Sequence, residues 1–82
     1  MKGKNQKGQL RALKAKETIM IKGKKVQVEP VRNGQIIFCS RKLWNGKEFN
    51  DLVRDTAQSQ SPKGYTVTVE NDASNRKIIV RK

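Results

Sequence analysis

Residues 44–49 read WNGKEF, and this stretch decides where the chain starts its helix. Asn45 is a preferred N-cap residue, and Glu48, three positions later, can bond back to the N–H of the cap to complete a capping box. Trp44 and Phe49 occupy the two positions of a hydrophobic staple, which packs the residue before the cap against the fourth helical residue. The stretch therefore predicts a helix that begins directly after the cap.

The residues after this start have the spacing of an amphipathic helix. Apolar side chains recur at i, i+3, i+4 and i+8, in Phe49, Leu52, Val53 and Ala57. We predict a helix over residues 46–59, followed by a turn-rich linker at residues 59–64. Its apolar stripe must be buried against another element, and a sheet is the element that the flanking sequence supplies.

Three short β-rich segments precede the helix, at residues 18–21, 26–29 and 36–39. Gly23, between the first two, can supply the positive φ of a tight turn. The pair Asn33-Gly34 is the strongest short hairpin signal, and a two-residue loop there pairs Arg32 with Gln35. The third segment is apolar throughout, which predicts burial on both faces or a central place in the sheet.

A second hairpin follows the helix. Residues 65–70 alternate, with Tyr65, Val67 and Val69 on one face, and residues 76–81 form the returning strand after a polar loop. The sequence thus predicts an α+β fold of order βββαββ. It consists of a three-stranded antiparallel meander, one amphipathic helix packed on the sheet, and a C-terminal β-hairpin. The other face of the sheet would stay solvated, as antiparallel sheets permit.

The N-terminal residues differ in composition from the rest. Residues 1–9 contain no apolar residue after Met1, so we expect a flexible basic arm there. Residues 9–17 are good helix formers and predict a short helical turn. Residues 10–82 would then form a single small α+β domain.

Charge is the dominant feature of the composition. Nineteen Lys and Arg residues stand against seven Asp and Glu residues, which gives a formal net charge of +12. Residues 1–25 hold nine of the basic residues and one acidic residue, a net charge of +8. Such an excess attracts anions and is typical of proteins that bind nucleic acid.

The sequence offers little for catalysis. It has no histidine, and a single cysteine, Cys39, has no histidine partner that could activate it as a nucleophile. Cys39 lies in an apolar segment, where a small buried hydrophobic residue is the better interpretation. We therefore predict a non-enzymatic protein with no cofactor, metal ion or disulfide. No stretch approaches 18 apolar residues and no secretory signal is present, so we expect a cytoplasmic protein without a membrane partner.

The candidate nucleic-acid-binding residues fall into three groups. They are Lys14 and Lys16 near the N-terminus; Lys22, Lys24, Lys25, Gln27, Arg32 and Gln35 in the first hairpin; and Arg41, Lys42, Arg76, Lys77 and Arg81 around the helix start and on the last strand. Lysines would fix the register on phosphates, while arginines and the two glutamines, expected to point outward, would read base edges. A two- or three-stranded ribbon of this kind fits the major groove.

The few aromatic residues favour duplex DNA or shape-driven binding over sequence-specific recognition of RNA. Phe49 and Trp44 belong to the staple and Phe38 to a strand expected to be buried, which leaves only Tyr65 free to stack on a base. One alternative is a small regulator or inhibitor that docks on an acidic protein surface, and a weaker one is an RNA- or ribosome-associated basic protein. The oligomeric state stays open.

Overall fold

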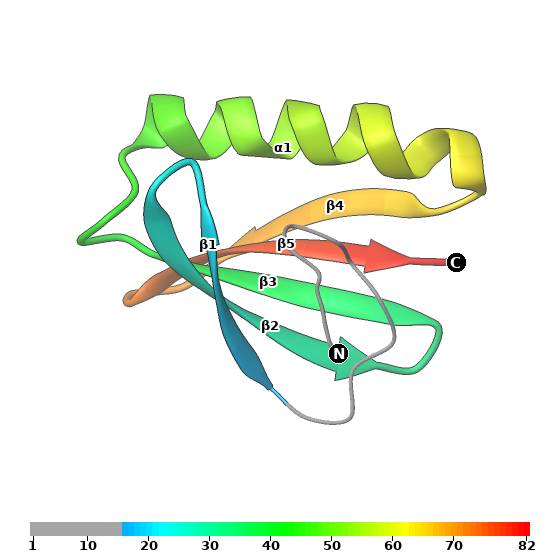
Figure 1. The fold of residues 1–82 in the computed structure, drawn as a ribbon, viewed down its shortest axis with the longest axis horizontal. Helices are drawn as coiled ribbons and strands as arrows, with labels where there is room; N and C mark the ends of the chain where they lie inside the picture. Colours follow the sequence, from blue (N-terminus) through cyan, green and yellow to red (C-terminus); the bar gives the residue numbers. More distant parts are fainter. Residues whose placement is uncertain (1–15) are drawn as a thin grey trace, which may run out of the picture.

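The computed structural model describes residues 16–82, which form one five-stranded antiparallel sheet with a helix along one face (Figure 1). The elements are β1 (Glu17–Ile21), β2 (Lys24–Val31), β3 (Gly34–Ser40), α1 (Gly46–Gln60), the short 3-10 helix η1 (Ser61–Lys63), β4 (Thr66–Asn71) and β5 (Asn75–Arg81). The strands lie in the order β1-β2-β3-β5-β4. The predicted α+β order of meander, helix and hairpin is confirmed, and the hairpin joins the meander because β5 pairs with β3.

The N-terminal predictions fall mostly beyond this part of the chain. The arm expected over residues 1–9 lies outside the described residues, as does most of the helical turn expected over residues 9–17. The last residue of that turn, Glu17, begins β1 and pairs with Val28, so the prediction is wrong at its C-terminal end. Within residues 16–82, no helix has the length and apolar character needed to cross a membrane.

Strand β3 is central, as its apolar run predicted, and its two faces differ. Ile37 and Cys39 are buried on the side of the helix, whereas Ile36 and Phe38 alternate with them and lie half-buried on the opposite side. The hydrophobic core lies between the helix-facing side of the sheet and the start of the helix. The buried apolar residues are Val26, Val28, Ile37, Cys39, Trp44, Phe49, Leu52, Ile78 and Val80.

The start of the helix is built as the sequence predicted. Asn45 is the N-cap, its side-chain oxygen accepts from the N–H of Glu48 at 2.8 Å, and the Glu48 carboxylate accepts from the N–H of Asn45 at 3.2 Å. Trp44 and Phe49, the two staple residues, are both buried. The indole N–H of Trp44 also donates to the carbonyl oxygen of Lys25 at 3.4 Å, which fixes the start of α1 to β2.

The buried row of the helix is shifted from the predicted stripe. Phe49 and Leu52 are buried as expected, but the row continues through Thr56 and Gln60, while Val53 and Ala57 are half-buried. Positions i, i+3, i+7 and i+11 follow a nearly straight line along a helix, so a helix lying flat on the sheet buries that row. Its later turns lie beside the edge strand β4 (Figure 1).

The two turns of the meander use positive φ angles at different positions. Lys22 (φ 54°) and Gly23 (φ 80°) both adopt them, as a two-residue hairpin loop of type I′ requires, so the predicted tight turn is confirmed. The second loop consists of Arg32 and Asn33, with Asn33 at φ 63°, and Val31 pairs with Gly34. The predicted Asn33-Gly34 loop, which paired Arg32 with Gln35, is therefore wrong.

Gly34 has a different role from the one its sequence context indicated. It belongs to β3, where its register partner on β5 is Arg81. A Cβ atom at this position would collide with the backbone carbonyl oxygen of Val80 and would lie 2.8 Å from the Cα of Arg81. Glycine is required here because two backbones approach closely, and Asn33 takes over the left-handed conformation of the turn.

This close approach predicts that Gly34→Ala is strongly destabilising. The new methyl group meets backbone atoms that cannot rotate away, so we expect a loss of about 3 kcal/mol in the free energy of unfolding. Gly46→Ala is the matched control, because no atom lies within 4 Å of its Cβ position; it should change stability by less than about 1 kcal/mol. Urea unfolding followed by Trp44 fluorescence measures both, and equal stability of the two variants would contradict the prediction.

Candidate nucleic-acid interface

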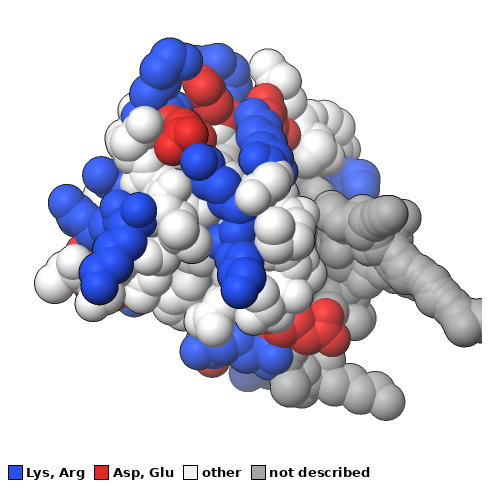
Figure 2. Space-filling model, turned by 60° about the vertical axis from the view of Figure 1, so that its left-hand side comes forward, with Lys and Arg blue, Asp and Glu red and all other residues white. Residues whose placement is uncertain are grey.

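The helix and the rest of the described chain differ in charge. Residues 46–60 hold two basic and three acidic residues, a net charge of −1, whereas the other residues between 16 and 82 hold twelve basic and four acidic ones, a net charge of +8. Figure 2 shows many basic side chains on the end of the molecule that faces left in Figure 1, with several of the visible carboxylates near the top, where α1 lies. The cationic surface thus belongs to the sheet and its loops.

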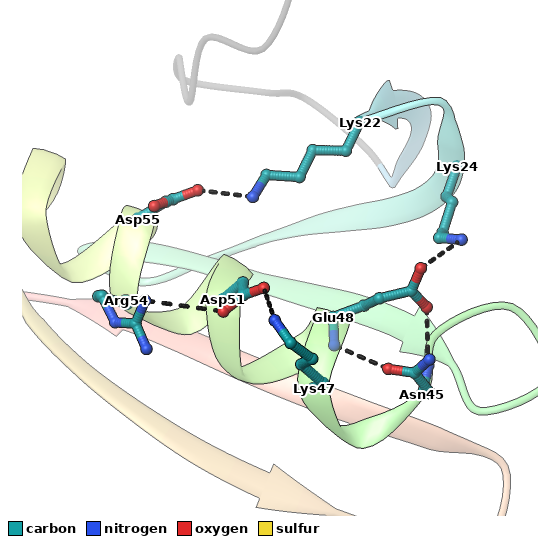
Figure 3. Close-up of polar contacts among 8 residues, drawn as sticks. All are labelled: Lys22, Lys24, Asn45, Lys47, Glu48, Asp51, Arg54 and Asp55. Carbon is teal, nitrogen blue, oxygen red and sulfur yellow. Dashed lines mark hydrogen bonds and ion pairs between the residues drawn. The ribbon is translucent and has the colours of Figure 1, made fainter.

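Two of the predicted binding residues are engaged by the helix. The ammonium group of Lys22 lies 2.8 Å from a carboxylate oxygen of Asp55, and that of Lys24 lies 2.9 Å from Glu48 (Figure 3). The hydrogen bond to Asp55 raises the pKa of the Lys22 amine above its ordinary value. Both lysines therefore join the β1–β2 turn to α1 through exposed ion pairs, which solvent and salt screen.

Glu48 serves two contacts at once. One carboxylate oxygen accepts from the Asn45 N–H in the capping box, and the other faces Lys24 (Figure 3). The hydrogen bond from Lys24, followed by the one from the Asn45 backbone, holds the pKa of Glu48 below its ordinary value. The ionised form of Glu48 thus links the helix start to the sheet.

The open face of the sheet, opposite α1, brings together a second set of predicted residues. Gln27, Phe38 and Lys77 are direct neighbours across β2, β3 and β5. The ammonium groups of Lys16 and Lys77 lie 5.1 and 5.5 Å from the centre of the Phe38 ring. The sequence interpretation placed Phe38 in the core, and this is wrong, because β3 turns Ile37 and Cys39 inward and Phe38 outward.

A hollow of about 450 Å³ opens on this face beside Phe38. Its lining includes Thr18, Lys25, Gln27, Phe38, Ser40 and Asn75. Leu43, which is 47% exposed, also borders it. The hollow therefore combines one aromatic ring, one nearby lysine and four side chains that can donate and accept hydrogen bonds.

Two predicted residues lie on the helix side instead. Gln35 was expected to point outward, but it is only 7% exposed and neighbours Val80 in the register, so this prediction is wrong. Gln35 lies two and four positions before Ile37 and Cys39, on the same side of β3, so it must face the helix once those two residues enter the core. Arg76 also lies on that side, with its guanidinium 5.9 Å from the Phe49 ring and its Nε buried without a hydrogen-bond partner.

The remaining predicted residues lie at the two ends of the sheet. Arg81 is on the open face at one end, and Arg32 is exposed in the nearby β2–β3 turn. At the other end Arg41 donates to the carbonyl oxygen of Asp72 at 3.2 Å, next to the exposed Lys42. Lys14 lies outside the described residues. The structure therefore gathers Lys16, Lys25, Gln27 and Lys77, and leaves the other exposed candidates apart from them.

The β4–β5 loop at that second end is held by Asp72. Its carboxylate accepts from the N–H groups of Ser74 and Asn75 at 2.8 and 2.7 Å. The Asn75 and Ser74 bonds lower the pKa of Asp72, and Lys77, 3.4 Å away, adds to the effect. Lys77 thus stands between this loop and the ring of Phe38.

Sequence reasoning found Gln27 but missed Phe38 and three polar residues of the hollow, Thr18, Ser40 and Asn75. A signal was present, since Phe38 alternates with Ile37 and Cys39, but the unbroken apolar run left the inward side of β3 undecided. Cys39 itself is fully buried, and burial raises its thiol pKa to about 12, which confirms the interpretation of a small buried hydrophobic residue. Residues 16–82 contain no group of three or more His, Cys, Asp or Glu side chains placed to hold a metal ion.

Comparison of the chain with protein-family models, curated proteins and solved structures gave no match. The function is therefore inferred from the residues and their arrangement.

The Glu48 contacts predict a loss of stability in acid. The folded-state pKa of Glu48 lies below its ordinary value of 4.5, so between the two values the unfolded chain binds more protons. The stabilisation from Glu48 is therefore complete above the ordinary value and is lost as the pH falls through the lowered pKa. Melting temperatures measured from about pH 7 to about pH 3 should fall at the acid end.

Glu48→Gln should flatten this acid limb, because it keeps an acceptor for the Asn45 N–H and removes the titrating charge. Glu70→Gln is the control, since no ion pair of Glu70 occurs among residues 16–82. It should follow the wild-type profile. An acid limb equally steep in Glu48→Gln and the wild type would contradict the assignment.

Proposed function

We propose that the protein binds nucleic acid, without catalysis of its own, through phosphate contacts from the sheet side of the molecule. The observation that supports this proposal is the separation of charge between the helix, at −1, and the rest of residues 16–82, at +8. A polyanion approaching the sheet and its loops meets most of the lysine and arginine residues outside α1, apart from Lys22, Lys24 and Arg76, which lie toward the helix. Each neutralised phosphate releases counterions. Residues 1–15 add five basic residues and no acidic one.

Four side chains are our first choice for phosphate contacts. Lys16, Lys25, Lys77 and Arg81 lie on or beside the open face, and Gln27 among them can bond to a base edge. Lys22 and Lys24 are second in rank, because their ion pairs with helix carboxylates, at 2.8 and 2.9 Å, are closer than the 3.4 Å between Lys77 and Asp72. Gln35 drops out because it is buried.

Phosphate contacts are common to duplex and single strands, so the proposal covers both. The preference for duplex DNA came from counting Phe38 as a core residue, and its half-buried place on the open face removes that support. Because the open face is made of β-strands, it could still bind in a groove of duplex DNA. The choice between duplex and single-stranded nucleic acid therefore depends on whether the Phe38 ring stacks on a base.

A protein-interaction module is the second candidate, and strand β4 favours it. β4 is an edge strand, and its residues TVTVEN include neither a proline nor a lysine, which usually protect such edges. A partner could add a strand to it through main-chain hydrogen bonds. A pull-down that survives nuclease treatment would favour this candidate, and loss of every partner after nuclease would favour nucleic acid.

The salt dependence of binding tests the first proposal. The logarithm of the affinity for a short DNA duplex should fall linearly with the logarithm of salt concentration, with a slope of about −0.9 per phosphate contacted. Lys25→Ala/Arg81→Ala should weaken binding and reduce the slope by about 1 for each residue. Lys47→Ala/Arg54→Ala removes the same charge from α1 and should leave the slope close to the wild-type value.

Fluorescence anisotropy between about 50 and 200 mM salt measures these slopes. An affinity that does not change over this range, or the same change of slope in both double variants, would contradict the proposed interface.

A further inference from the structure

We propose that the hollow beside Phe38 holds one unpaired nucleobase stacked on the Phe38 ring, which makes single-stranded nucleic acid the preferred partner. This inference rests on the proposed function and adds the part of the nucleotide that phosphate contacts do not recognise. Three features support it: the position of the Phe38 ring, the polar side chains around the hollow, and the lysine ammonium groups near the ring.

The ring stands where a base can reach it. Phe38 lies in the middle strand of the sheet, opposite α1, with Gln27 on one side and Lys77 on the other in the register. The hollow of about 450 Å³ next to it is open and large enough to admit a single base. Stacking on an aromatic ring accepts every base, because each base has a π-face.

The polar lining suits the edge of a base. Within residues 16–82, the side chains of Thr18, Gln27 and Asn75 make no hydrogen bond, and each can donate and accept. Ser40 accepts from the Lys42 N–H at 3.2 Å and keeps its hydroxyl donor. A base entering the hollow would therefore find hydrogen-bonding groups that form no competing bonds among these residues.

The charges select an occupant that is anionic as well as aromatic. Lys25 lines the hollow, and the ammonium groups of Lys16 and Lys77 lie over the Phe38 ring, 5.1 and 5.5 Å from its centre. Exposed cation–π contacts are weak and both side chains are long, so the ammonium groups can move from the ring to a phosphate. A nucleotide supplies both the ring and the phosphate, whereas an acidic peptide supplies charge without a base to stack.

The test compares strands with and without bases. The probes are a fluorescein-labelled oligothymidylate and an abasic oligonucleotide of the same length, bound to the full 82-residue chain. The wild type should bind oligothymidylate about tenfold more tightly than the abasic strand. Phe38→Leu should bring this ratio close to one while leaving the abasic affinity unchanged, and Phe38→Tyr, which keeps a ring, should preserve it. Lys25→Ala should weaken both probes by the same factor.

A ratio that persists in Phe38→Leu would overturn the stacking site and leave the proposed phosphate binding standing. Failure of the wild type to bind either probe at low salt while it binds a DNA duplex would overturn the single-strand preference alone, and failure to bind the duplex as well would overturn both proposals. Ultraviolet crosslinking of oligothymidylate to the unaltered protein gives a second readout that does not depend on the folding of a variant. A crosslink mapped to Phe38 supports the inference, and crosslinks found only outside the hollow would contradict it.

Discussion

The pairing of β3 with β5 is the contact on which the structure depends. It runs from Gly34 opposite Arg81 to Ser40 opposite Asn75 and joins the meander to the hairpin that follows the helix. These strands are far apart in the sequence, so the pairing must offset the entropy of closing a long loop. Once formed, it makes one sheet with a helix on one face, and it leaves the other face open for Phe38 and its neighbours.

Local signals explain why the helix was predictable and the register was not. The capping box and staple of residues 44–49 act within one turn, so the sequence alone places the start of α1. The β2–β3 loop was misplaced because Asn33-Gly34 is a strong turn signal locally, while Gly34 is needed for its contact with Val80, about half the chain away. The turn preference can be recognised from the local sequence, whereas the contact with Val80 becomes apparent only when β3 and β5 are paired.

The same limit applies to the candidate site. Alternation could place Val26 and Val28 on one side, but the run Ile36–Cys39 is apolar at every position and has two possible orientations. The core settles the choice by taking Ile37 and Cys39, which buries Gln35 and exposes Phe38. The net charge could be predicted from the composition. Which lysines are free and which are paired could not, because the pairs of Lys22 with Asp55 and of Lys24 with Glu48 form only when the β1–β2 turn meets α1.

The lysines over Phe38 connect the fold to the proposed function. An aromatic ring on an open sheet face is a liability, since exposed apolar surface promotes association between copies. Here the ammonium groups of Lys16 and Lys77 lie over the ring, and their like charges oppose the approach of a second copy. In the proposed complex, a phosphate would attract these ammonium groups away from the ring, because exposed cation–π contacts are weak. The contacts that cover Phe38 in the free protein would then be exchanged for contacts with the nucleotide.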